Sequence, residues 1–199
     1  MNGNIEKLFD SHSEWIQSEG EGGEQLTLER ISSDQLTNEQ LQMLTDSVLT
    51  ECSFTNIELR ENDFYHTEMY SCAFNNVSFV EVQFIKSEIN DTKFNGSSFE
   101  KINFNNAEIF DCIFLECTFS DSTFISTGIW NAMFDDCTFV NIDFESAYFE
   151  KIILHNSKFI NPINLDKATK IVINIGTVEN PLLLTHEESI KWIIENSIS

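Results

Sequence analysis

The sequence predicts an all-β solenoid of square coils with short helical caps at both ends. Two observations predict it. A large apolar residue recurs at every fifth position, and the residue type along that series changes with a period of 20. A period of five fits neither a helix of 3.6 residues per turn nor a strand with period two. Each unit must therefore turn the chain, and stacked repeats of this kind indicate a solenoid.

The large apolar residues form an unbroken series of 22 positions, most of them Phe. The residue two positions before each is small or β-branched, with Asn62 as the one exception. Both positions are expected to point into the tube. The series is Phe54, Leu59, Phe64, Met69, Phe74, Phe79, Phe84, Ile89, Phe94, Phe99, Phe104, Ile109, Phe114, Phe119, Phe124, Ile129, Phe134, Phe139, Phe144, Phe149, Leu154 and Phe159.

Four of the non-aromatic members, Met69, Ile89, Ile109 and Ile129, lie 20 residues apart. Four units therefore make one coil, with one aliphatic wall and three aromatic walls. Phe rings in register, about one strand spacing (~4.8 Å) apart, would fill the interior. This filling leaves no internal space for a small ligand.

Units such as Cys52-Ser53-Phe54 and Cys72-Ala73-Phe74 resemble those of the pentapeptide-repeat family. The resemblance covers residues 50–161 and implies a right-handed quadrilateral β-helix. The segment Ser11–Leu28 also resembles a leader that precedes the repeats in some members of the family.

The limits of the repeat divide the chain into three parts: an acidic N-terminal capping segment (1–49), the repeat β-helix (50–161) and a C-terminal cap with a terminal helix (162–199). In the first part we expect a short helix around residues 5–18, a Gly-rich turn at 20–23, and a second short helix with Thr37 or Asn38 as N-cap. These elements are expected to cover the open edge of the tube.

The repeat register fails at Pro162. Beyond it, Ile171–Ile175 reads as a strand. Thr185 followed by Glu188 is a capping-box pattern that begins a terminal helix. This helix is expected to cap the tube or to join two subunits. The C-terminal module dimerises in several quinolone-resistance members of the family, so the resemblance implies a possible homodimer.

The net charge of −22, from 33 acidic against 11 basic residues, favours basic partners and opposes binding to nucleic acid or anionic lipid. The first 23 residues are too polar for a signal peptide, and no apolar run approaches the ~20 residues of a membrane span. Five cysteines in no metal or secretory pattern indicate a reducing compartment. We expect a soluble, cytoplasmic protein.

No sequence motif points to catalysis. The cysteines Cys52, Cys72, Cys112, Cys117 and Cys137 all occupy the small inward position, where thiols pack as small apolar groups. The four histidines are scattered, and no phosphate-binding loop or nucleophile elbow is present. The sequence predicts a protein that is not an enzyme, with no catalytic residues, no cofactor and no metal.

Two sets of outward-facing residues are predicted to bind a partner. The acidic set contains Glu68, Glu88 and Glu108 in one column and Asp91 and Asp111 in another. The apolar set contains Phe110 and Trp130 in one column and Ile113, Met133 and Ile153 in the next, so that the two columns meet at a corner. The alternatives are a merely solvated acidic surface and a C-terminal segment that folds over the apolar corner.

The function expected is occupation of a basic surface on a partner protein. In one version the acidic rod mimics DNA and acts on a topoisomerase or another DNA-handling protein, because stacked carboxylates resemble phosphates spaced ~3.4 Å along a strand. Family members that bind DNA gyrase support this version by resemblance. Their coils are often interrupted by loops, and this run is unbroken. The alternatives are an immunity protein against a basic secreted toxin and a structural or regulatory scaffold.

Overall fold

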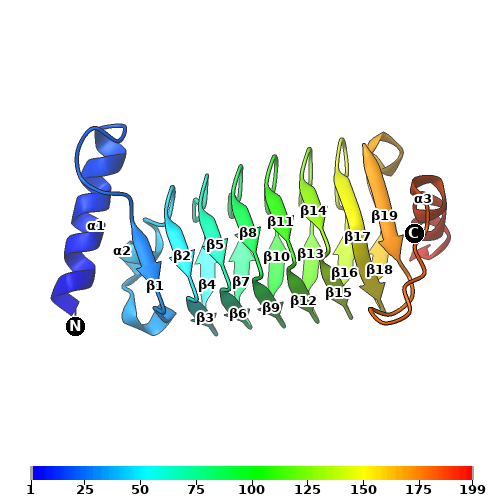
Figure 1. Cartoon of the computed structure of the whole chain (residues 1–199), viewed down its shortest axis with the longest axis horizontal. Helices are drawn as coiled ribbons and strands as arrows, with labels where there is room; N and C mark the ends of the chain where they lie inside the picture. The colour runs from blue at the N-terminus through cyan, green and yellow to red at the C-terminus, as the bar shows by residue number, and fades with distance from the viewer. Residues whose placement is uncertain (1, 199) are drawn as a thin grey trace.

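The computed structural model describes residues 2–198 and is a parallel β-solenoid of about seven turns (Figure 1). Helix α1 (Asn2–Gln17) lies at one end and helix α3 (His186–Glu195) at the other. The only other α-helix in the described part of the chain is the single turn α2 (Asn38–Leu41). The fold class predicted from the sequence is confirmed.

The strands stack in columns that form the faces of the tube. Face 1 contains β1 (Thr27–Glu29), β2 (Val48–Thr50), β5 (Glu68–Tyr70), β8 (Glu88–Asn90), β11 (Glu108–Phe110), β14 (Gly128–Trp130), the first half of β17 (Tyr148–His155) and β19 (Lys170–Asn174). Face 2 contains β3 (Ser53–Thr55), β6 (Ala73–Asn75), β9 (Lys93–Asn95), β12 (Ile113–Leu115), β15 (Met133–Asp135) and the second half of β17.

The other two faces complete each coil. Face 3 contains β4 (Glu58–Arg60), β7 (Ser78–Val80), β10 (Ser98–Glu100), β13 (Thr118–Ser120), β16 (Thr138–Val140), β18 (Lys158–Ile160) and β20 (Ser197–Ile198). Face 4 is held by single bridges, from Asp63 with Gln83 to Asp143 with Ile163. Within the coils each pairing shifts by 20 residues, for example Ile89 with Ile109, as the sequence period predicts.

The chain turns at corners where the backbone is left-handed. One coil shows this at Glu51, Asn56, Glu61 and His66, whose φ angles lie between 53° and 56°. Such angles cost free energy in most L-residues, and Asn and Asp tolerate them better than others. The corners are accordingly rich in Asn and Asp. The five-residue period is therefore the spacing between corners.

Phe rings fill the interior in register. Neighbouring rings in one column lie parallel, as for Phe94 and Phe114, whose centroids are 4.7 Å apart with planes 3° apart. The same column continues to Phe134 at 4.6 Å. A void of only about 10 Å³ lies among the rings of the last coils, near Phe144 and Phe149. The interior is thus packed solid by its own side chains.

The N-terminal cap explains the one irregular inward residue. Asn62 is buried, and its Nδ2 donates to the Leu41 carbonyl oxygen at 2.8 Å. The predicted cap of α2 is confirmed, since the Thr37 hydroxyl accepts from the Gln40 N–H. An amide at position 62 therefore satisfies the end of α2, which an apolar residue could not do.

The segment Ser11–Leu28 runs from α1 through a turn into β1 at the end of the tube. Gly23 has a φ of 70°, and a side chain there would overlap the backbone of Ser11, so helix α1 and the following turn pack closely. His12 is buried beneath Trp15, with ring centroids 5.8 Å apart.

At the other end, β19 adds to face 1 and α3 packs on β19. The predicted capping box of Thr185 and Glu188 is confirmed. The Ile171 N–H donates to His186 Nδ1, and the Ile173 N–H donates to the Ser189 hydroxyl. Side chains of α3 therefore accept hydrogen bonds from the free edge of β19. Since β1, β2 and β19 belong to the sheets, the parallel stacking extends beyond residues 50–161 at both ends.

Candidate partner-binding surface

The glutamate column lies on face 1, with Glu68, Glu88 and Glu108 in register on successive coils. Glu68 accepts from the Tyr70 hydroxyl at 2.8 Å, and Glu88 accepts from Asn90 Nδ2 at 2.7 Å. The hydrogen bond to Glu68 is the main cause that raises the pKa of Tyr70 to about 12. Glu68 and Glu88 are therefore oriented by their neighbours, while Glu108 is exposed.

Asp91 and Asp111 occupy the corner between faces 1 and 2, with φ angles of 46° and 54°. Both are exposed, and Asp91 accepts from the Ser71 hydroxyl at 2.9 Å. The same corner carries Asn131 and Lys151 in the next two coils. The corner also carries Glu51 in the first coil, where its carboxylate is paired with Arg30. The aspartates of this corner therefore lie in the middle coils.

Phe110 and Trp130 form an aromatic stack on the outside of face 1. Their centroids are 4.6 Å apart with planes 10° apart, and Trp130 is followed by Tyr148 at 5.6 Å. The Lys170 ammonium lies 5.2 Å from the Tyr148 ring centroid. A side chain at Gly128 would overlap the Trp130 ring, so this glycine lets the indole lie against the wall.

Ile113, Met133 and Ile153 lie in register on face 2 and are half-buried. Only the corner residue and one inward residue separate Phe110 from Ile113 along the chain. The structure therefore brings the predicted apolar columns to the two sides of one corner. The C-terminal segment reaches this column at its end, where Asn174 pairs with Ile153.

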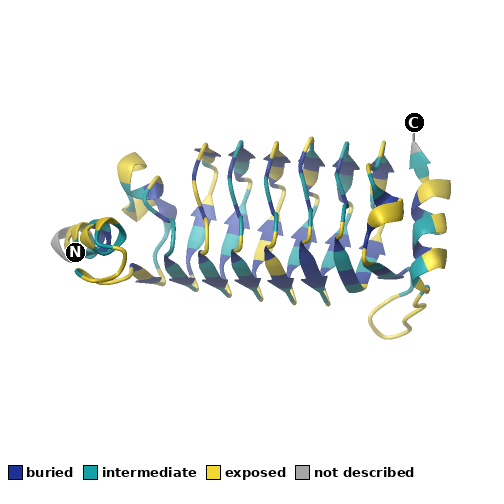
Figure 2. Cartoon of the chain, turned by 90° about the horizontal axis from the view of Figure 1, so that it is seen from above, coloured by how far each residue is buried: buried dark blue, intermediate teal, exposed yellow. Residues whose placement is uncertain are grey.

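The most exposed apolar side chains lie elsewhere and were missed by the sequence analysis. They are on the C-terminal cap, where Val178 is 74% exposed and Ile194 59% exposed, with Leu182 and Leu183 also exposed. The loop between β19 and α3 extends from the body of the molecule (Figure 2). The apolar periodicity of residues 190–194 predicted a helix but not which of its faces meets the tube.

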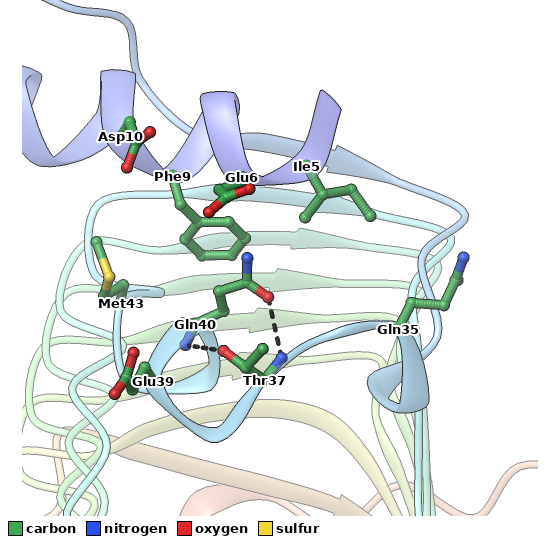
Figure 3. A pocket seen from close by; sticks show the side chains of 9 residues that line it. All are labelled: Ile5, Glu6, Phe9, Asp10, Gln35, Thr37, Glu39, Gln40 and Met43. Atoms are coloured by element: carbon green, nitrogen blue, oxygen red, sulfur yellow. Dashed lines mark hydrogen bonds between the residues drawn. The ribbon is translucent and has the colours of Figure 1, made fainter. Parts of the chain in front are cut away.

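A pocket of about 350 Å³ lies between α1 and α2 in the N-terminal cap (Figure 3). Its apolar lining includes Ile5, Phe9 and Met43, and its acidic lining includes Glu6 and Glu39. A second hollow of about 230 Å³ runs beside the glutamate column at the corner that carries His66 and Lys86. Both hollows are acidic, in keeping with the charge of the chain.

The cysteines are buried free thiols, as predicted. Burial is the largest cause that raises the pKa of Cys112 to about 12, which keeps this thiol protonated and unreactive. Across residues 2–198, no group of three or more His, Cys, Asp or Glu side chains is arranged to hold a metal ion. None of the helices in that range is long and apolar enough to cross a membrane.

Comparison with known proteins identifies the repeats. The family model for a pentapeptide repeat region matches residues 47–124, so this part of the chain is a pentapeptide-repeat region. A search of curated proteins finds no match.

Several solved structures are similar to this chain. Full-length QnrB1, described as a plasmid-mediated fluoroquinolone resistance protein, is 12% identical over 58% of this chain and 80% of its own, with a TM-score of 0.32. HetL from Nostoc sp. strain PCC 7120, described as involved in heterocyst differentiation regulation, is 10% identical over 70% and 81%, with a TM-score of 0.21. Rfr23 from Cyanothece 51142 is 10% identical over 70% and 84%, with a TM-score of 0.24.

Proposed function

We propose that this protein is a non-enzymatic, cytoplasmic binding solenoid that occupies a basic surface of a partner protein through the corner between faces 1 and 2. The observation that supports this most is the Phe110–Trp130 stack, which lies in the same coils as Glu108, Asp91 and Asp111. Aromatic side chains surrounded by charge are typical of protein interfaces. The net charge of −22 would attract a basic partner over a long range.

The acidic columns favour a partner that normally binds DNA. Glu68, Glu88 and Glu108 repeat at one strand spacing, ~4.8 Å. DNA also presents its charges at short regular intervals, with one phosphate per ~3.4 Å of helix axis on each strand. Their negative charge would then replace phosphates in the groove of a topoisomerase or another DNA-handling protein.

The apolar corner favours a second candidate, an immunity protein that neutralises a basic toxin. Tight complexes depend on a few buried aromatic or apolar anchors. Phe110, Trp130 and Met133 are side chains of this kind on a rigid wall. In this case the apolar contacts would contribute more to binding than the carboxylates.

Affinity capture from the native cell extract at low and high salt tests the proposal. Three baits are compared: the wild-type protein, Trp130→Glu, and a triple variant with Glu68, Glu88 and Glu108 changed to Gln. We expect a basic partner that Trp130→Glu no longer captures. If the partner is no longer captured by the triple variant or at high salt, the protein mimics DNA. If the partner is still captured in both cases, the result supports an immunity protein. A partner bound equally by all three baits would contradict the proposal.

We also propose that the C-terminal cap joins two copies of the chain. Val178, Leu182 and Ile194 are exposed there, and apolar side chains gathered on a cap favour burial against a second surface. Light scattering after size exclusion should give twice the monomer mass, and Leu182→Glu with Ile194→Glu should give the monomer mass. A wild-type monomer at high concentration would contradict the dimer.

A further inference from the structure

The N-terminal cap is joined to the first coil by one buried imidazole. His12 of α1 is 1% exposed. Its Nδ1 accepts the N–H of Leu26 at 3.0 Å, and its Nε2 lies 2.9 Å from the carbonyl oxygen of Thr45. The ring therefore connects three segments of chain that are distant in sequence. We call this arrangement the His12 bridge.

Only one protonation state of the ring satisfies both contacts. The Leu26 N–H needs a lone pair on Nδ1, and the Thr45 carbonyl needs a hydrogen on Nε2. Neutral imidazole with its hydrogen on Nε2 provides both. A second proton on Nδ1 would face the Leu26 N–H with another donor, and the hydrogen bond would be lost.

The surroundings of the ring oppose its charged form. Trp15 of α1, Leu26 and Thr45 face it without charge. The hydrogen bond to the Thr45 carbonyl and, to a smaller extent, the nearby Asp46 carboxylate favour the proton. Burial is the larger effect, so the pKa of His12 lies below its usual value of 6.5.

We infer that the His12 bridge makes the N-terminal cap acid-sensitive: protonation of His12 detaches α1 from the first coil while the Phe-filled coils stay folded. Detachment would uncover the first strand edge, the apolar end of the tube at Leu44, and Phe9 on the inner side of α1, both of which are buried in the closed cap. An uncovered strand edge is a site where other chains can pair.

The direction of the pH effect follows from linkage. Because the folded-state pKa is below that of the unfolded chain, the unfolded cap binds the proton first. The stabilisation is complete above pH 6.5 and falls as the pH drops from 6.5 through the folded-state pKa. Two other histidines lie on the outer surface, where His66 contacts Asp46 and His155 contacts Asp135.

Hydrogen exchange at the Leu26 amide tests the inference directly. The protection factor is measured by NMR at pH 7.5 and pH 5.0, each corrected for the intrinsic exchange rate. Because the proton binds the open cap more tightly than the closed cap, we expect the wild-type Leu26 protection to fall at pH 5.0. The amides of the central coils, such as Phe114, should keep their protection.

His12→Gln is the matched variant, because its side chain is polar but does not titrate. We expect its Leu26 protection to be the same at both pH values, while His66→Gln should keep the wild-type pH dependence. If His12→Gln does not fold, the His12 ring nitrogens are titrated by NMR in the wild-type protein. Loss of Leu26 protection must then follow His12 protonation. An unchanged wild-type protection at pH 5.0, or a loss that does not follow His12, would overturn the inference.

Discussion

Two aromatic stacks on neighbouring faces of the tube, one inside and one outside, have the same geometry. Inside, Phe114 and Phe134 are 4.6 Å apart with planes 10° apart. Outside, Phe110 and Trp130 are also 4.6 Å apart with planes 10° apart. The inner rings are at most 2% exposed, whereas the outer rings are only half-buried. The 20-residue register sets the spacing of both stacks, and burial decides which of them stabilises the fold.

The inward side chains stabilise the fold, and the residues of the outer surface are free to vary. The inner rings lose all contact with water, and each fully buried large apolar side chain contributes about 1.5–3 kcal/mol. The outer rings keep part of their surface available for a partner. The same repeat therefore builds both a rod and a binding surface.

The largest effect is expected inside the tube. Phe104 is packed between Phe84 and Phe124 at 5.1 and 5.0 Å, and Phe104→Asp would place a charge there without a partner. A buried charge without a partner costs several kcal/mol, and loss of the ring costs about 3–5 kcal/mol more, which together approach the 5–15 kcal/mol that stabilises most domains. We expect no cooperative unfolding transition by circular dichroism. The control Asn105→Asp, on the outer surface, should fold; a folded Phe104→Asp would show that the interior is not closed.

A smaller loss of stability is expected where the interior of the tube meets the N-terminal cap. Asn62→Val gives this coil the residue type found at Val82 in the next coil and removes the donor to the Leu41 carbonyl. A buried carbonyl left without a partner costs about 1–3 kcal/mol. Urea unfolding should show this loss, and hydrogen exchange should place it near α2. A more stable Asn62→Val protein would contradict the role given to the amide.

On the outside, Gly128→Glu restores the glutamate column and displaces the Trp130 ring. We expect a loss of about 0.5–1.5 kcal/mol, the usual contribution of an aromatic pair, and a weaker near-ultraviolet circular dichroism signal. In a Trp130→Ala background the same substitution should have little further effect. Equal losses in both backgrounds would mean that Gly128 acts on the backbone instead.

The smallest change in stability is expected for the stacked carboxylates. Glu108→Gln relieves repulsion from Glu88 and should stabilise the protein by about 0.2–1 kcal/mol at low salt. The gain should disappear in about 1 M salt, where charges are screened within ~3 Å. Glu100→Gln is the control, because Glu100 lies between Val80 and Ser120 rather than another acid. A gain that persists at high salt would rule out repulsion as the cause.

The sequence predicted the fold because the constraint is local and repeated. Each coil needs an inward residue such as Phe114 and a small one such as Cys112, and their spacing alone gives the number of faces. The same register placed Phe110 and Trp130 in one column and Met133 across the corner. Both the tube and the members of the candidate surface could therefore be read from the sequence.

The features that could not be predicted from the sequence depend on contacts between distant segments. Nothing near Asn62 indicates that its partner is Leu41, and nothing near His12 indicates that Thr45 covers its ring. The break in the glutamate column at Gly128 was visible, but its reason is the conformation of Trp130. These features arise where the repeat ends or is interrupted, because there the neighbouring coil no longer determines the environment.

The most direct test of the division between inside and outside compares Phe114→Ala with Phe110→Ala by urea unfolding. Both substitutions remove a ring from a stack of the same spacing, but Phe114 lies inside the tube and Phe110 lies on its outer surface. We predict a loss of about 3–5 kcal/mol for Phe114→Ala, as for other buried Phe residues, and less than about 1.5 kcal/mol for Phe110→Ala. Equal losses would contradict the account, because the outer stack would then stabilise the fold as much as the core.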